Sequence, residues 1–182
     1  MEIEKRIASL IRRTSSSLSK DVLDALKAAS LREAKGSSAR MILWTLLQNA
    51  GLARRNGTPM CQDTGTLTFF VDERLRSKVT PSVIKDAVVH ATGMGWLRRN
   101  TIDSVTGASV DSNVCDGAPV IHYISADGVK SAPAVTLLMK GGGSENMSRQ
   151  YSLPDSALGA GRDLAGVRAC LLDAVVKTQG YG

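Results

Sequence analysis

The segment PMCQDTGT, residues 59–66, places three different reactive side chains next to one another. The thiolate of Cys61 is a soft ligand suited to an iron–sulfur cluster. The carboxylate of Asp63 can move a proton, and the amide of Gln62 can orient a polar substrate. A flanking proline and glycine favour an irregular, ordered loop. On this pattern alone, a turn with a buried thiol is the alternative to a metal and substrate site.

A second segment, KGGGSEN, contains three successive glycines. Glycine runs cost backbone entropy, so we expect them where the chain needs their conformational range or close approach to a ligand. After a predicted strand, Gly141, Gly142 and Gly143 can turn their N–H groups toward one point, and Lys140 adds a positive charge. The spacing matches neither the P-loop nor the dinucleotide G-x-G-x-x-G pattern. The segment predicts an anion-binding or close-approach loop, with a plain tight turn as the alternative.

The composition is that of an ordinary globular protein, with 43% hydrophobic and 22% charged residues in 182. A net charge of +6 suggests nucleic acid, but the basic residues are scattered and only 4% of residues are aromatic, which leaves few stacking platforms. A mild positive charge also suits an enzyme of small dianions. No apolar run approaches the ~20 residues that span a bilayer, and no signal peptide is recognisable. We therefore expect a cytoplasmic protein without nucleic-acid or membrane partners.

The three cysteines, Cys61, Cys115 and Cys170, show neither zinc-finger nor redox-motif spacing. An odd number in a cytoplasmic chain argues against a disulfide framework. We expect Cys115 and Cys170 to be small buried side chains.

The N-terminal part, residues 1–57, is predicted to be helical. Apolar residues recur at helical spacing in three stretches that are separated by serine-rich breaks. Ser19 is the expected N-cap of the second helix, and Ser37 or Ser38 that of the third. Gly57 suits the C-terminal end of the third helix.

The remaining part, residues 58–182, mixes strands with helices. TLTFFV is a predicted strand, and Thr80 followed by Pro81 predicts a helix over 81–97. Two further strands flank Asp127–Gly128, most simply as a hairpin, and a last helix is predicted over 162–177. The sequence thus predicts one α+β domain over 1–182, with a largely antiparallel sheet and flanking helices.

The segments PMCQDTGT and KGGGSENMS together resemble the class I fumarate hydratase and L(+)-tartrate dehydratase family of iron–sulfur hydro-lyases. The part they resemble is the α subunit or N-terminal part of the enzyme. The stretches GWLRRNTIDS and DSNVCDGAPVIHY occur between them in the family's order. The resemblance covers essentially the whole chain.

The resemblance implies roles for individual residues. Cys61 would be the first of three thiolates that hold a four-iron, four-sulfur cluster with one open iron. Gln62 and Asp63 would contact substrate, with Asp63 taking part in proton transfer. Arg98, or its neighbour Arg99, would clamp a substrate carboxylate, and the KGGGSEN loop would line the same pocket. The reaction would be the hydration of fumarate to L-malate, or the dehydration of L-tartrate to oxaloacetate.

The chain also departs from the family pattern. The resemblance places the second cluster cysteine in a Cys-Pro-Pro segment expected immediately after Gly182, and the third further on. One thiolate cannot hold a cluster. We therefore expect an N-terminal fragment that is inactive alone and is completed by a β subunit or C-terminal domain, in a homodimer or an α2β2 assembly. A non-catalytic anion- or phosphate-binding module that uses the KGGGSEN loop is the alternative function.

Overall fold

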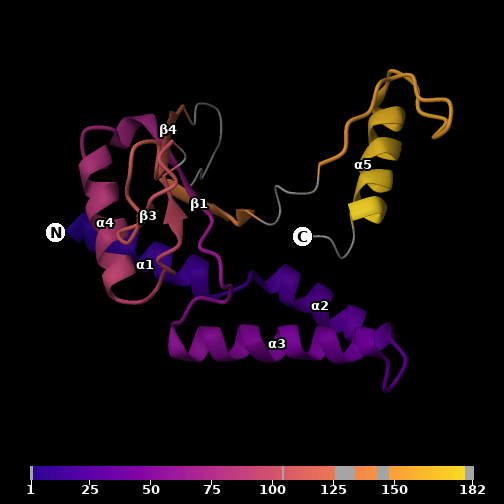
Figure 1. The fold of residues 1–182 in the computed structure, drawn as a ribbon, viewed down its shortest axis with the longest axis horizontal. Helices are drawn as coiled ribbons and strands as arrows, with labels where there is room; N and C mark the ends of the chain where they lie inside the picture. Colours follow the sequence, from indigo (N-terminus) through magenta and orange to yellow (C-terminus); the bar gives the residue numbers. More distant parts are fainter. Residues whose placement is uncertain (1, 104, 126–133, 143–147, 179–182) are drawn as a thin grey trace. The chain divides into compact units, whose positions relative to one another are not determined.

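The computed structural model describes residues 2–103, 105–125, 134–142 and 148–178, and its contacts divide the chain into two compact units, Met1–Lys140 and Gly141–Gly182. The elements, in chain order, are α1 (Glu2–Ser16), α2 (Lys20–Arg32), α3 (Ser38–Asn56), β1 (Thr66–Asp72), the 3-10 turn η1 (Glu73–Leu75), α4 (Pro81–Gly93), β2 (Thr101–Ile102), β3 (Ser109–Val110), β4 (Val120–Ile124), β5 (Val135–Lys140) and α5 (Leu164–Thr178). Helices come first and strands mix with helices afterwards, which confirms the α+β prediction (Figure 1). The single-domain reading of 1–182 stays a prediction.

The ends of the N-terminal helices follow from their capping residues. The Ser37 side chain accepts a hydrogen bond from the backbone N–H of Arg40, which satisfies one unpaired donor at the start of α3. Gly57 ends α3 in the left-handed region, with φ +66°, where glycine has no Cβ penalty. Ser19 occupies the N-cap position of α2 without a capping hydrogen bond from its side chain.

Helix α4 begins where the sequence predicts and ends earlier. The Thr80 hydroxyl accepts from Val83 N, and Pro81 takes the first helical position. The helix ends at Gly93 and does not continue to residue 97, because the chain turns at Gly95, which has φ +73°. Leu97 lies beyond this turn and is still buried.

The larger sheet has three strands in the order β4-β1-β5. β1 pairs parallel with β4 and antiparallel with β5, while β2 and β3 form a separate antiparallel pair. The predicted hairpin is therefore wrong: β4 and β5 lie on opposite edges of β1 and do not pair with each other. The Asp127–Gly128 turn lies outside the described residues. A central strand needs hydrogen-bond partners on both edges, and β1 takes one from each of these two strands.

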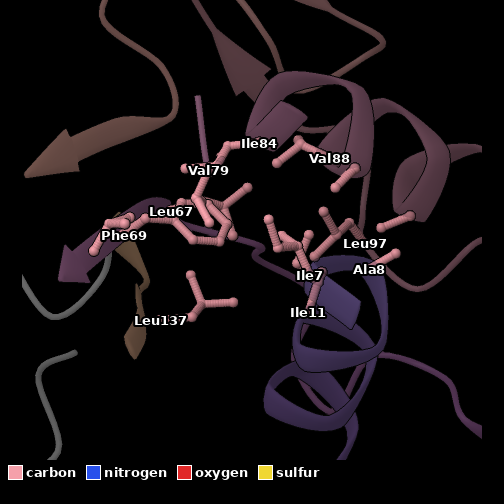
Figure 2. Packing of buried hydrophobic residues seen from close by; sticks show 13 residues of the cluster. Ile7, Ala8, Ile11, Leu67, Phe69, Val79, Ile84, Val88, Leu97 and Leu137 are labelled. Atoms are coloured by element: carbon pink, nitrogen blue, oxygen red, sulfur yellow. The ribbon is translucent and has the colours of Figure 1, made fainter. Parts of the chain in front are cut away.

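The core of the first unit forms where α1 and α4 pack against the inward face of β1 (Figure 2). Alternate residues of β1 point into it, as the two-residue period of a strand requires, and Phe69 is fully buried. Ile7 and Ile11 from α1 and Ile84 from α4 pack in the same cluster. The core thereby fixes β1, and with it the loop that precedes β1.

The second unit is built around α5. Gly166 packs so closely on the chain that a Cβ there would lie 2.0 Å from Gly161 O. The Tyr151 hydroxyl donates to Asp173 Oδ2 at 2.6 Å, and this bond raises the pKa of Tyr151 to about 12. The apolar residues that the sequence places on one face of this helix are exposed: Leu164, Val167, Leu171 and Val175. Within the described part of the chain, no helix has the length and apolar character needed to cross a membrane.

Candidate active site around Cys61

The loop between α3 and β1 contains Cys61, and its first half is fixed by two helices. Met60 N donates to the Ser15 carbonyl at the end of α1, at 2.9 Å. The Met60 carbonyl accepts from Asn49 Nδ2 of α3, also at 2.9 Å. Two backbone groups of one residue are therefore held immediately before Cys61, so the loop leaves the helices in a defined direction.

The second half of the loop is fixed to the segment after α4 through Thr64 and Arg98. The buried Thr64 hydroxyl donates to the Arg98 carbonyl at 3.0 Å and accepts from Arg98 N at 2.7 Å. Arg98 Nε also donates to the Cys61 carbonyl at 3.4 Å. The guanidinium has further N–H groups that a carboxylate can accept. Of the two arginines left open by the sequence, Arg98 is thus the one that contacts the loop in the structure.

Asn100 contacts three consecutive loop residues with one amide side chain. Its Nδ2 donates to the Gln62 carbonyl at 3.2 Å and to Asp63 Oδ1 at 3.0 Å. Its Oδ1 accepts from Thr64 N at 3.3 Å. Gly65 N adds a second hydrogen bond to Asp63 Oδ1, at 2.8 Å. These contacts set the direction of the Asp63 carboxylate, which is the group that the sequence predicts to move a proton.

Cys61 and Gln62 lie at the exposed end of the loop. Asp63 N donates to Cys61 Sγ at 3.5 Å, and Sγ lies 3.8 Å from Gln62 Oε1. Backbone N–H bonds to sulfur are among the features that tune iron–sulfur sites. The other two thiols differ, since Cys170 is buried as predicted and Cys115 is only half-buried. The alternative of a turn with a buried thiol at residue 61 is therefore wrong.

Strand pairing places Lys140 near this loop. It is the last residue of β5 and pairs with Thr66, the first residue of β1 and the neighbour of Gly65. Gly141 and Gly142 follow it and belong to the second unit, and Gly143 lies outside the described residues. The anion nest of the three glycines stays a prediction.

Three residues that hold the loop in place were not predicted from the sequence. Thr64 lies inside the recognised segment, Asn100 follows the paired arginines, and Asn113 lies in a polar loop. Asn113 donates to the Arg98 carbonyl at 2.7 Å and so supports the same segment from the protein interior. Serine, threonine and asparagine are common in plain turns, so their types alone gave no signal.

Comparison with known proteins places the chain in a family. The family model described as fumarate hydratase (Fumerase) matches residues 4–181. The chain belongs to this fumarate hydratase family. The resemblance seen in PMCQDTGT and KGGGSENMS is thereby confirmed.

Three relatives show how far the similarity extends. A protein of Geobacillus stearothermophilus, whose name assigns it to fumarate hydratase class I, is 42% identical over 95% of this chain and 34% of its own length. One of Methanocaldococcus jannaschii, whose name assigns it to L(+)-tartrate dehydratase subunit alpha, is 29% identical over 86% of this chain and 56% of its own length. The L(+)-tartrate dehydratase subunit alpha of Escherichia coli (strain UTI89 / UPEC) is 31% identical over 75% of this chain and 46% of its own length. This fumarate hydratase family chain therefore spans between a third and somewhat more than half of these relatives.

No three histidine, cysteine, aspartate or glutamate side chains gather at one point in the described ranges. An exposed thiol that accepts a backbone N–H suits one ligand position of a cluster. Among the described residues, Cys61 is thus an exposed thiol of the kind that a cluster can use as one ligand, and one thiolate alone cannot hold a cluster.

Proposed function

We propose that the chain is the α-type or N-terminal part of an iron–sulfur hydro-lyase that acts on a C4 dicarboxylate. Family membership and the names of the relatives support a hydro-lyase of the fumarate or L-tartrate type. One observation carries the proposal: an exposed thiol, an amide and a carboxylate occupy three successive positions of one loop, and that loop is fixed by hydrogen bonds to Arg98 and Asn100.

In this proposal each group has a separate task. Cys61 is one thiolate ligand of a four-iron, four-sulfur cluster, which, when bound, supplies a Lewis acid for the hydroxyl and carboxylate of the diacid. Arg98 pairs with a substrate carboxylate, and its positive charge stabilises the negative charge that builds there when a proton leaves the neighbouring carbon. Gln62 orients the diacid. Asp63 takes part in the proton transfer, and Asn100 and Gly65 N hold its Oδ1.

A partner completes the site in this account. Two of the relatives are named as subunits alpha, and the chain spans only part of each relative's length. We infer that a β subunit or C-terminal domain brings the remaining cluster thiolates, further arginines and a proton-abstracting group, in a homodimer or an α2β2 assembly. The 182-residue chain alone then holds no cluster and has no turnover. Lys140 with Gly141–Gly143 is proposed to line the same pocket, and a cytoplasmic location stays a prediction.

The direct test is turnover by the intact enzyme that contains this chain. Anaerobic preparations are assayed with fumarate, L-malate and L-tartrate, before and after exposure to air. We expect turnover of one of these diacids that is lost in air, as for an exposed cluster. Asp63→Asn should lower kcat by at least about 100-fold, the lower range for removal of a group that transfers a proton. Asp86→Asn on α4, an exposed carboxylate, is the matched control.

Other outcomes would support a different function. Binding of inorganic phosphate without turnover of any diacid would favour the anion-binding module. Affinity for DNA or RNA that falls steeply with salt would favour a nucleic-acid binder. Iron and sulfide should produce no visible cluster absorbance with the chain alone, and stoichiometric reconstitution would contradict the single-ligand account.

A further inference from the structure

Asn113 has an unusual combination of burial and backbone conformation. The residue is 1% exposed, and its φ is +58°, in the left-handed region. Among the described residues it is the one non-glycine residue with positive φ. Asparagine adopts this region more readily than most residues, yet the conformation carries a cost. Such a cost is retained when the side chain must lie at a particular place, as it does here between α4 and the segment that follows it.

The Asn113 amide uses its full hydrogen-bonding capacity. Nδ2 donates to the Arg98 carbonyl at 2.7 Å and to Thr92 Oγ1 at 3.1 Å. Oδ1 accepts from Thr101 Oγ1 at 2.8 Å and from Thr101 N at 3.3 Å. A primary amide has two N–H donors and one carbonyl oxygen with two lone pairs, so every position is satisfied. The contacts at Arg98 and Thr101 lie at the two ends of one four-residue segment.

That segment, 98–101, holds the second half of the candidate active-site loop. Its first residue exchanges two backbone hydrogen bonds with the Thr64 hydroxyl. Its third residue, Asn100, contacts the Gln62 carbonyl and the Asp63 carboxylate. Any shift of the segment therefore moves the groups that hold Asp63.

We propose that Asn113 is a positioning residue for the reaction. It fixes segment 98–101 from the buried side. Arg98 is thereby placed to meet a carboxylate of the diacid, and Asn100 is placed to hold the Asp63 carboxylate. The catalytic meaning of this inference rests on the proposed function, whereas the coupling of Asn113 to the loop does not. Substrate contact belongs to the loop and Arg98, and Asn113 acts only through them.

Asparagine is the side chain that this position requires. Aspartate has nearly the same shape and also tolerates positive φ, but its carboxylate would face the Arg98 carbonyl with an oxygen where an N–H is needed. Asn113→Asp therefore removes the donors while it preserves size and backbone preference. Asn56→Asp makes the same chemical change at an exposed position at the end of α3 and is the matched control.

The experiment is a double-mutant cycle in the intact enzyme with Asn113→Asp and Asn100→Ala. We expect each single substitution to lower kcat/KM at least about tenfold, a loss in the range reported for small misplacements. If Asn113 acts through segment 98–101, the kcat/KM of the double variant is at most about threefold lower than that of the less active single variant. A double variant whose loss equals the product of the two single losses overturns the proposal.

A second readout separates this inference from the proposed function. In the chain itself, we expect Asn113→Asp to increase hydrogen exchange at Arg98 N at least about tenfold, with exchange in the core strand β1 unchanged. Unchanged exchange at Arg98 N would refute the inference even if the enzyme is a hydro-lyase. Increased exchange in an enzyme without diacid turnover would refute the proposed function, and with it the catalytic role, while the coupling stands. If Asn113→Asp does not fold, Thr101→Val removes one of the same hydrogen bonds and must give the same pattern at smaller amplitude.

Discussion

Replacement of Thr64 by valine is the most informative single change in the candidate site. Valine matches threonine in shape but lacks the hydroxyl, so the substitution removes both bonds to Arg98 and leaves the packing volume intact. The Arg98 carbonyl keeps its bond from Asn113 Nδ2. Arg98 N loses its acceptor, the hydroxyl of residue 64, which is only 4% exposed as threonine.

The size of the effect follows from these contacts. An unsatisfied buried donor costs about 1–3 kcal/mol, and a lost neutral hydrogen bond about 0.5–1.5 kcal/mol. Because Arg98 itself is exposed, water can reach part of the region, and we expect a combined loss of about 2 kcal/mol in the free energy of unfolding. For a chain of this length that corresponds to a fall in Tm of about 4–8 °C.

The assay compares Thr64→Val with Thr64→Ser by thermal unfolding, followed by circular dichroism, and by hydrogen exchange at Arg98 N. Serine keeps the hydroxyl and loses only a methyl group, so it should cost less than about 1 kcal/mol and leave the exchange slow. If the two variants agree within about 0.5 kcal/mol and exchange alike, the hydroxyl does not hold the loop and the description of the site is wrong.

Two further predictions concern parts of the chain away from the site. Hydrogen bonds from Arg74, chiefly from its side chain and also from its backbone N–H, lower the pKa of Asp72 to about 2. The stability that this contact contributes is therefore present above about pH 4 and is lost as the pH falls toward 2. Arg74→Ala should therefore move the acid-unfolding midpoint to higher pH in circular dichroism, and an unchanged midpoint would contradict this. Gly166→Ala should destabilise the second unit in urea, because the added Cβ would lie 2.0 Å from Gly161 O. At Gly93 an added Cβ meets no atom within 4 Å, so Gly93→Ala should raise the free energy of unfolding by up to about 1 kcal/mol. Equal effects of the two glycine substitutions would refute the contact argument.

The sequence predicted the local features of the fold because capping and turn chemistry act over a few residues. Ser37, Gly57 and Thr80 lie at the helix ends where their side chains or backbone predict them. The hairpin was wrong for the opposite reason, since strand pairing depends on residues far apart in the chain. β1 precedes both β4 and β5 and lies between them, and no local pattern in either strand reports this.

For the candidate site, the residues inside the motif were predictable and the distant residues that support them were not. Cys61, Gln62 and Asp63 were found because their types are unusual together and because the segment resembles a family. The supporting residues Asn100 and Asn113 act through hydrogen bonds to backbone groups 36–38 and 12–15 positions away, so their importance appears only once the chain is folded.

The central claim is that Cys61 binds iron, and Cys61→Ser in the anaerobically prepared intact enzyme tests it most directly. The matched control is Cys115→Ser, which makes the same exchange at a half-buried thiol. Iron content and diacid turnover are measured on the same samples. The account predicts that Cys115→Ser keeps the wild-type values of about four irons per site, while Cys61→Ser loses most of its iron and its turnover. Wild-type iron content and turnover in Cys61→Ser would contradict the account.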